Sequence, residues 1–331
     1  MGDRTLVTGG AGFIGSHVVD ALLDRGDDIV VLDNFNDYYD PKRKVANIAQ
    51  HTENPRLHLV VGNVYDQSTV SYAFKKFPRI NKIVHLAARA GVRASQDDPQ
   101  GYALTNVLGT RIVLNMAREH KVGNVVFASS SSVYGDTAKL PFSESDTLGK
   151  PLSPYAETKQ KGEELCQNFS CEDDVPVTCL RFFTVYGPRG RPDMAPYLFT
   201  DKIFKGVPIV VYGDGTSTRD YTYVSDIVSG ILAALDTSRP FEIFNLGNNM
   251  PVPLEELVST IENIVGKKAN IVQKKRVHSD VEHTCADISK AQTFLGYASH
   301  TSLRDGLENF FSWYKIFVMH DEKLLNSPKS I

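Results

Sequence analysis

Gly9-Gly10-Ala11-Gly12-Phe13-Ile14-Gly15 joins a short β-rich run, residues 5–8, to a longer helical pattern, residues 13–25. A glycine-rich turn between a strand and a helix is typical of a dinucleotide-binding fold, whereas a glycine string alone is weak evidence. Gly9 would allow the tight turn, Gly12 would let a pyrophosphate approach the backbone, and Gly15 would let helix and strand pack closely. The free N–H groups at the start of the helix would then face the phosphates.

Short apolar runs alternate with longer helical patterns through the first half of the chain. The apolar content of each run is continuous, as in the strands of a parallel sheet that is covered on both faces. This alternation predicts an α/β fold built on a Rossmann-like, doubly wound parallel sheet. The predicted strands are 5–8, 29–33, 57–61, 82–86, 124–129 and 177–182, and two of the predicted helices are 13–25 and 101–120.

Asp33 ends the second predicted strand. A carboxylate at this point of the fold accepts hydrogen bonds from a ribose 2′-hydroxyl and repels a 2′-phosphate, so we expect NAD rather than NADP. Asn63, after the third strand, is either an adenine contact or a plain turn residue. Leu86-Ala87-Ala88, after the fourth strand, would leave room for a dinucleotide or would serve packing alone.

Tyr155 and Lys159 form a candidate acid–base pair. In a helix, residues four apart share one face, so the phenol and the ammonium can meet. A nearby cation favours the phenolate and lowers a pKa that is normally about 10. The pair would give a base able to take a proton from an alcohol near neutral pH.

Four adjacent hydroxyls, Ser129 to Ser132, close the fifth predicted strand. Ligands bind at the carboxyl ends of the strands in doubly wound folds. One hydroxyl could hydrogen-bond an alcohol or a ketone, although a serine-rich loop without a ligand is an equal possibility. With Tyr155 and Lys159 the run completes a Ser-Tyr-Lys set.

Composition excludes several classes of protein. The 331 residues, 42% of them hydrophobic and 23% charged, suit a soluble globular protein with two lobes. The net charge of -3 argues against nucleic acid as a partner, and no apolar run approaches the ~20 residues of a membrane-spanning helix. The four cysteines show no metal-ligand spacing. We therefore predict no metal site, no membrane partner and a reducing, cytoplasmic location.

From Thr5 to about Tyr314 the chain resembles the extended short-chain dehydrogenases/reductases of the nucleotide-sugar epimerase type. Within that family it is most similar to the UDP-glucuronate 4-epimerases. Three segments carry this narrower resemblance: DNFNDYYDP at 33–41, AGVR at 90–93 and RFFTVYGPRGRPDM at 181–194.

The resemblance implies that Ser130, Tyr155 and Lys159 are catalytic. Tyr155 would remove the proton of the sugar 4-hydroxyl, Ser130 would hydrogen-bond the C4 oxygen, and Lys159 would bind the nicotinamide ribose. The 4-keto sugar would rotate and regain its hydride on the other face, so NAD would stay tightly bound in its oxidised form. The implied cofactor-binding residues are Gly9, Gly12, Phe13, Ile14, Gly15, Asp33, Asn34, Asn63, Val64, Leu86, Ala87, Ala88, Tyr155, Lys159 and Phe183.

A uronate substrate adds a chemical constraint, because a ketone at C4 is β to the C6 carboxylate and the intermediate is prone to lose carbon dioxide. Short hydroxyl side chains could hold the carboxylate away from the reactive geometry. Thr184 could instead bond only to backbone, Arg191 could be a surface or phosphate contact, and Asn106, expected to reach the ligand, could bond only to protein. The implied substrate-binding residues are Arg93, Ser130, Ser131, Ser132, Tyr155, Thr184, Arg191, Arg219 and Asp280, with a closing segment near Arg276.

The same resemblance predicts an NAD-binding domain at 1–180 and a nucleotide-sugar-binding lobe at 181–331. Proline and glycine become frequent beyond about Pro188, which favours shorter elements there. Some segments of the second lobe are expected to return to the first domain. We also expect a homodimer through helices 101–120 and 155–171. Its face would include Leu104, Val107, Leu108 and Ile112, unless these are buried within the monomer.

Three alternatives stay open. UDP-glucuronate decarboxylases are similar but usually carry Glu at the position of Ser132 and Asn at that of Thr184. A UDP-glucose 4-epimerase would not need the segment 184–194. A non-catalytic NAD-binding protein on this fold would often lack Tyr155 or Lys159. The chain also departs from the family pattern at Arg89, Asn63 and Ser279, where Gln, Asp and Gly are common.

Overall fold

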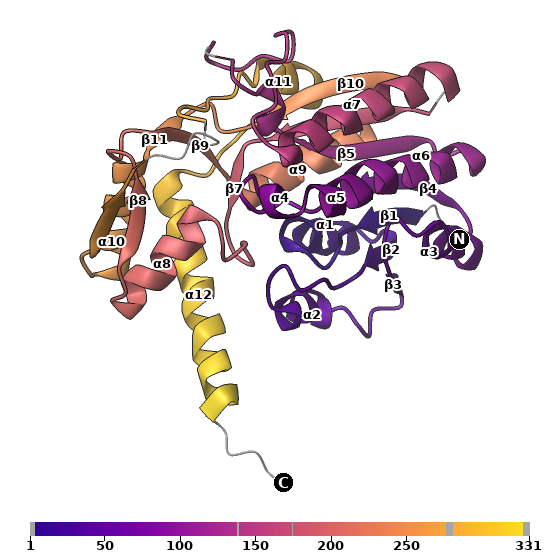
Figure 1. Ribbon diagram of the computed structural model, residues 1–331. Helices are drawn as coiled ribbons and strands as arrows, with labels where there is room; N and C mark the ends of the chain where they lie inside the picture. The colour runs from indigo at the N-terminus through magenta and orange to yellow at the C-terminus, as the bar shows by residue number, and fades with distance from the viewer. Residues whose placement is uncertain (1–3, 138, 174, 276–280, 327–331) are drawn as a thin grey trace.

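The computed structural model describes residues 4–137, 139–173, 175–275 and 281–326 (Figure 1). Its main body is a seven-stranded sheet in the order β10-β6-β5-β4-β1-β2-β3, with every neighbouring pair parallel. The predicted Rossmann-like doubly wound sheet is confirmed. Its strands are β1 Arg4–Thr8, β2 Asp28–Asp33, β3 Leu57–Val61, β4 Ile80–His85, β5 Asn124–Ser130, β6 Val177–Phe182 and β10 Phe241–Leu246.

Two apolar cores cover the two faces of this sheet. Successive side chains of a strand point to opposite faces, so adjacent residues such as Leu6 and Val7 enter different cores. One core packs α1 Phe13–Asp24, α9 Val224–Asp236 and α11 Ser289–Leu295 on the sheet. The other packs α3 Gln67–Lys76, α6 Gly109–Glu119 and α7 Pro154–Asp173.

The strand β3 differs from the prediction of buried strands. It is the edge strand of the sheet, and the side chains of Leu59 and Val61 are 42% and 65% exposed. Val60, between them, is only 4% exposed, so one face of β3 is covered and the other is not. Continuous apolar character therefore did not mean burial on both faces here.

The predicted helix 101–120 is divided into three parts. α5 Pro99–Ala103 is followed by a π-helical turn, η1 Leu104–Leu108, and then by α6. Ile112 is only 7% exposed and belongs to the core under α6, so the alternative of burial within the monomer holds for this residue. Leu104 is 40% exposed, and the homodimer stays a prediction.

A smaller lobe lies beside the carboxyl ends of the strands (Figure 1). It contains a three-stranded sheet, β11-β9-β7, and a two-stranded sheet, β12-β8, with its own apolar core. Its elements are β7 Thr184–Tyr186, α8 Ala195–Lys205, β8 Ile209–Tyr212, β9 Thr218–Tyr223, β11 Pro251–Pro253, α10 Leu254–Val265, β12 Ile271–Lys274 and α12 Leu303–Asn326. The remaining helices are α2 Pro41–Ala49, α4 Ala94–Asp97 and the 3-10 helix η2 Ser131–Tyr134.

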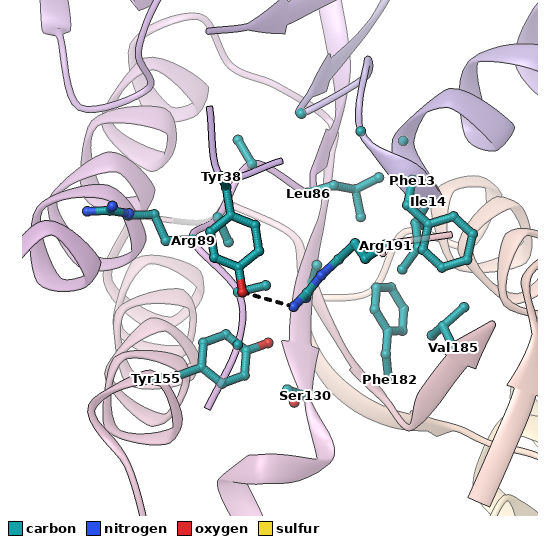
Figure 2. Close-up of a pocket in the computed structure, with 18 of the residues that line it drawn as sticks. Phe13, Ile14, Tyr38, Leu86, Arg89, Ser130, Tyr155, Phe182, Val185 and Arg191 are labelled. Carbon is teal, nitrogen blue, oxygen red and sulfur yellow. Dashed lines mark hydrogen bonds between the residues drawn. The ribbon is translucent and has the colours of Figure 1, made fainter. Parts of the chain in front are cut away.

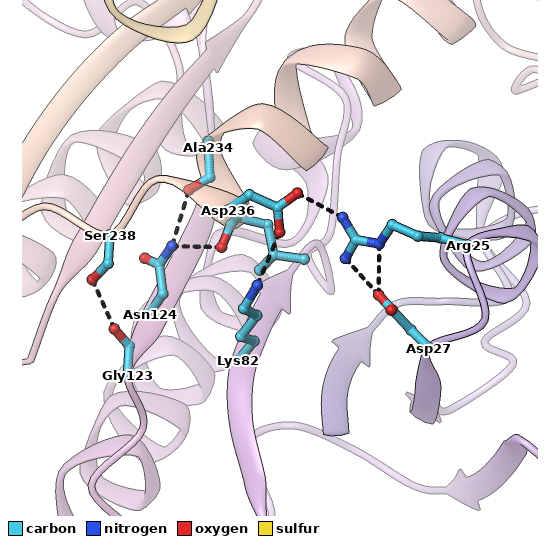
Figure 3. Close-up of polar contacts among 9 residues, drawn as sticks. Arg25, Asp27, Lys82, Gly123, Asn124, Ala234, Asp236 and Ser238 are labelled. Atoms are coloured by element: carbon cyan, nitrogen blue, oxygen red, sulfur yellow. Dashed lines mark hydrogen bonds and ion pairs between the residues drawn. The ribbon is translucent and has the colours of Figure 1, made fainter. Parts of the chain in front are cut away.

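The helix α9 comes from the part of the chain predicted to form the second lobe, residues 181–331. It nevertheless packs on the large sheet (Figure 3). Asn124 of β5 donates from Nδ2 to the carbonyls of Ala234 and Leu235, which are among the last of α9, at 2.9 Å each. Asp236 pairs with Arg25 at 2.6 Å and with Lys82 of β4 at 2.9 Å. The helix α9 and the strand β10 therefore both come from the second half of the chain and belong to the main body.

Among the described residues, none of the helices is both long enough and apolar enough to cross a membrane.

A buried carboxylate, Glu163, joins α7 to two strands. Its Oε1 accepts from the Ser129 hydroxyl at 2.5 Å and from Arg181 Nε at 2.9 Å, while Oε2 accepts from Arg181 Nη2 at 2.8 Å. The Arg181 and Glu163 side chains are 3% and 6% exposed. Such a pair is expensive to break, because one partner is left as an uncompensated buried charge.

We predict that Glu163→Ala lowers the free energy of unfolding by about 3–5 kcal/mol, measured by urea denaturation. The matched control is Glu157→Ala on the same helix, whose ion pair with Lys161 is about half exposed on both sides. It should cost less than about 1 kcal/mol. Equal losses in the two variants would contradict an anchoring role for Glu163.

Candidate active site

A cavity of about 440 Å³ opens at the carboxyl ends of the strands, between the large sheet and the smaller lobe (Figure 2). It is lined by every predicted cofactor-binding residue. The predicted substrate residues Ser130, Ser131, Ser132, Tyr155, Thr184, Arg191 and Arg219 line it as well. The fold thus brings together residues from Gly9 to Arg219, at opposite ends of a long stretch of the chain.

The glycine turn fits a dinucleotide through its backbone geometry. Gly9 has φ +71°, and a Cβ there would lie 2.8 Å from the Ala87 nitrogen. A Cβ on Gly15 would lie 2.1 Å from the Gly9 carbonyl oxygen. No side chain caps the start of α1, which begins after Gly12, so its first N–H groups face the cavity.

Asp33 is fixed beside this turn by backbone donors. Its Oδ2 accepts from the Ala11 N–H at 3.1 Å and its Oδ1 from the Phe35 N–H at 2.9 Å. Next to it, Asn34 donates to Asn63 Oδ1 at 2.6 Å. The site predicted for the ribose and the adenine is therefore held rigidly, and these residues fit NAD.

Tyr155 and Lys159 lie on the face of α7 that points into the cavity. The helix begins at Pro154. Ser153, just before it, accepts from the Ala156 N–H at 3.1 Å through its hydroxyl and so caps the first turn. The Tyr155 ring packs edge-on against Tyr102. Lys159 Nζ donates to the Ala128 carbonyl at 2.6 Å and lies 5.9 Å from the centre of the Tyr155 ring.

The electrostatics of the pair differ from the prediction. Burial raises the pKa of Tyr155 above its usual value, whereas hydrogen bonding to Ser130 and the charge of Arg191 oppose that rise. Burial also lowers the pKa of Lys159 to about 8. The predicted depression of the Tyr155 pKa by Lys159 is therefore wrong for the protein alone, because desolvation outweighs the attraction of charges.

The four serines at the end of β5 differ in their hydrogen-bond partners. Ser129 turns away to Glu163, and Ser130 Oγ accepts from the Ser132 N–H at 3.2 Å, which caps η2. Ser132 has a buried hydroxyl without a hydrogen-bond partner among the described residues. An unpartnered buried hydroxyl is rare, and in a cavity wall it fits a ligand contact.

Two predicted contacts lie outside the cavity lining. Arg93 is exposed at the start of α4, outside the cavity lining, with its guanidinium 4.4 Å from the centre of the Tyr212 ring. Asn106 is buried and bonds to protein: it accepts from the Arg89 N–H and donates to the Arg89 carbonyl and to Thr158. Of the two alternatives left open for Asn106, hydrogen bonding to protein is the one observed, since the packing of α7 against the loop after β4 uses its amide. Asp280 and Arg276 lie outside the described residues.

The cavity wall also contains residues that the sequence analysis did not assign, among them Tyr38, Tyr39, Lys44 and Arg89. Tyr38 and Tyr39 belong to the segment 33–41, and Lys44 follows it. The close similarity of that segment to the family could have indicated that these residues line the site. Arg89 pairs with Asp98 at the start of α5 and points away from Tyr38 and Arg191 (Figure 2).

Comparison with known proteins places this geometry in a family. The model of the NAD dependent epimerase/dehydratase family matches residues 5–247. The chain belongs to this family. This match confirms the predicted cofactor NAD, and the relatives described next confirm the predicted resemblance and the isomerase class.

Individual members of the family are similar over nearly the whole chain. UDP-glucuronate 4-epimerase 4 of Arabidopsis thaliana is 42% identical over 97% of this chain and 77% of its own length. A crystal structure of UDP-glucuronic acid 4-epimerase from Bacillus cereus with UDP-glucuronic acid and NAD is 38% identical, covers 95% and 99% of the two chains, and has a TM-score of 0.88. A UDP-glucose 4-epimerase of Thermotoga maritima, crystallised with UDP-glucose, is 30% identical over 95% and 99%, with a TM-score of 0.87.

We predict that Gly15→Ala abolishes retention of NAD, because the new methyl group would meet backbone atoms that no rotamer change can move. The NAD content of the purified protein, measured after acid release, should fall to background. Gly123→Ala is the control, since its Cβ would only touch the Asn81 carbonyl at an ordinary 3.5 Å. Normal NAD content in Gly15→Ala would contradict the assigned turn.

The lowered pKa of Lys159 predicts a dependence of stability on pH. An unfolded lysine titrates near 10.4, so between about pH 8 and pH 10 the unfolded chain binds more protons than the folded chain. The cost of burying this ammonium is thus fully present below about pH 8 and is relieved as pH rises. Lys159→Met removes that cost, so its stability relative to wild type should decline across this window. Urea denaturation at several pH values measures the free energy of unfolding of both proteins. Lys161→Met, on the exposed face of α7, is the control, and its free energy of unfolding should change with pH as that of wild type does.

Proposed function

We propose that the chain is a UDP-glucuronate 4-epimerase that interconverts UDP-glucuronate and UDP-galacturonate. The observation that carries the proposal is the meeting, in one cavity, of Tyr155, Lys159 and Ser130 with a dinucleotide turn on one side and hydroxyl donors on the other. The similarity to UDP-glucuronate 4-epimerases over 97% of the chain supports the choice of sugar.

Tyr155 acts as the acid and base. Its phenolate takes the proton of the sugar 4-hydroxyl and later returns it to the 4-keto group from the same place in the wall. When bound, NAD takes up the hydride from C4 and gives it back on the opposite face, so no external oxidant is consumed. Ser130 hydrogen-bonds the C4 oxygen, and the cation of Lys159 favours the phenolate once the cavity is occupied.

The uronate carboxylate is held by short hydroxyl side chains. Ser131, Ser132 and Thr184 line the cavity, and Ser132 has the unpartnered hydroxyl. Hydroxyl donors fix the carboxylate away from the orientation in which the C5–C6 bond is perpendicular to the carbonyl plane, where carbon dioxide leaves fastest. These side chains are short and have few rotamers, so positioning them on the carboxylate costs little conformational entropy.

The nucleotide end is assigned to Arg219. Its Nη1 donates to the carbonyls of Thr218 and Glu282 at 2.9 and 3.0 Å, which directs the guanidinium along the rim of the cavity. A planar fork of donors suits a diphosphate. Arg276 and Asp280, expected to close over the nucleotide, lie outside the described residues.

Incubation of the purified protein with UDP-glucuronate and no added NAD tests the proposal. We expect a product of unchanged mass that co-elutes with UDP-galacturonate on anion-exchange chromatography. A product lighter by carbon dioxide would mean that the hydroxyl clamp is misassigned and that the enzyme is a decarboxylase. No conversion, even with NAD added, would refute the proposed substrate.

Tyr155→Phe tests the acid–base assignment. We expect the rate to fall at least about 10²-fold, because the group that takes the proton of the 4-hydroxyl is removed, while NAD content stays at the wild-type level. Activity within about tenfold of wild type would show that Tyr155 is not the base.

A further inference from the structure

The guanidinium of Arg191 is held on two of its nitrogens. Nε donates to Asp193 Oδ1 at 3.0 Å, and Nη2 donates to Asp193 Oδ2 at 2.5 Å. Nη2 also donates to Tyr38 Oη at 3.4 Å (Figure 2). Tyr38 in turn donates its proton to Asp193 Oδ2 at 3.1 Å. Nη1 makes no hydrogen bond within the residues that the structure describes. Three side chains thus form a closed triangle that leaves one nitrogen of Arg191 for a ligand.

The triangle lies at the sugar end of the cavity. Arg191 lines the wall near Tyr155, and its positive charge acts on that phenol. The centre of the Tyr38 ring is 5.4 Å from the guanidinium carbon. The phenol of Tyr38 fits closely over Gly91, where a Cβ would lie 2.5 Å from Tyr38 Oη. Tyr38 and Asp193 take no part in the acid–base chemistry proposed for Tyr155, Lys159 and Ser130.

Tyr38 stands at the end of a rigid loop that begins at Asp33. The Tyr38 N–H donates to Asn36 Oδ1 at 3.2 Å. Lys44, only 5% exposed, donates to Asn36 Oδ1 at 2.8 Å and to the Asn36 carbonyl at 2.9 Å. The loop therefore connects the predicted ribose site at Asp33 to the triangle. It fixes the Tyr38 phenol from the cofactor side, whereas Asp193 approaches Arg191 from the segment after β7.

We propose that Tyr38 is a positioning residue, which acts with Asp193 to turn the Nη1 edge of Arg191 toward the sugar of a bound UDP-sugar. The identity of that ligand rests on the proposed function. A planar guanidinium held along its other edge keeps a single orientation, so little side-chain entropy is lost when the sugar binds.

Tyr38→Phe tests the role without disturbing the core, because this side chain is 38% exposed and only the hydroxyl is removed. Titration calorimetry with UDP-glucuronate and with UDP separates the two ends of the ligand. We expect about tenfold weaker binding of UDP-glucuronate, from the loss of hydrogen bonds to charged groups, and UDP binding within twofold of wild type. Tyr72→Phe, which removes the hydroxyl of a half-exposed tyrosine away from the cavity, should change neither constant.

A double-mutant cycle shows whether Tyr38 acts through the triangle. In an Asp193→Asn background, Tyr38→Phe should change UDP-glucuronate binding by less than about twofold, since residues that act on one group are not additive. A full tenfold effect in that background, or equal weakening of UDP and UDP-glucuronate, would overturn the proposal. Wild-type protein that binds UDP-glucuronate without epimerising it would refute the proposed function, while the binding cycle would still decide the role of Tyr38.

Discussion

The hydrogen bonds and ion pair of Glu163 are the constraint on which the site depends. One carboxylate fixes the helix that carries Tyr155 and Lys159 to Ser129 on β5 and to Arg181 on β6. Ser129 precedes Ser130, and Glu163 lies one helical turn after Lys159. The distance between the serine loop and the acid–base helix is therefore set by a buried contact that makes no use of the ligand. A buried ion pair need not stabilise the fold more than apolar residues would. It can form, however, only when the helix α7 packs on the sheet in one position.

Burial of Tyr155 and Lys159, the proposed acid–base pair, works against the charges that the proposed catalysis needs. The phenol of Tyr155 has a raised pKa and the ammonium of Lys159 has a lowered pKa, because both lose water. Ser130 and Arg191 oppose the effect on Tyr155, although burial outweighs them. In the proposed mechanism, a positively charged nicotinamide near the phenol would oppose the effect of burial on Tyr155. Activation of the proposed base by the cofactor would suit a cycle in which NAD stays bound.

The sequence predicted those parts of the molecule that local chemistry determines. The glycine turn, Asp33 and the strands β1, β2 and β6 could be placed because turn geometry and continuous apolar runs are visible within a few residues. The sequence left open whether Ile112 and Asn106 are buried within the monomer, and it wrongly predicted a fully buried β3, because these environments depend on neighbours far along the chain. Asn106 bonds to Arg89 and Thr158, and one face of β3 is left uncovered. The pKa of Tyr155 was predicted in the wrong direction because helical spacing reveals a nearby cation but not the depth of burial.

Arg191 shows why the substrate side could be predicted less completely than the cofactor side. The glycine turn is one continuous segment, whereas the surroundings of Arg191 come from a loop after β2, the Gly91 segment after β4 and the chain after β7. Each segment carries a family-like sequence, but none reveals alone that Tyr38 meets Asp193. Because separate loops build this end of the cavity on a common sheet, its chemistry can change while the cofactor site stays intact. Similar folds that bind UDP-glucose and UDP-glucuronic acid agree with that division.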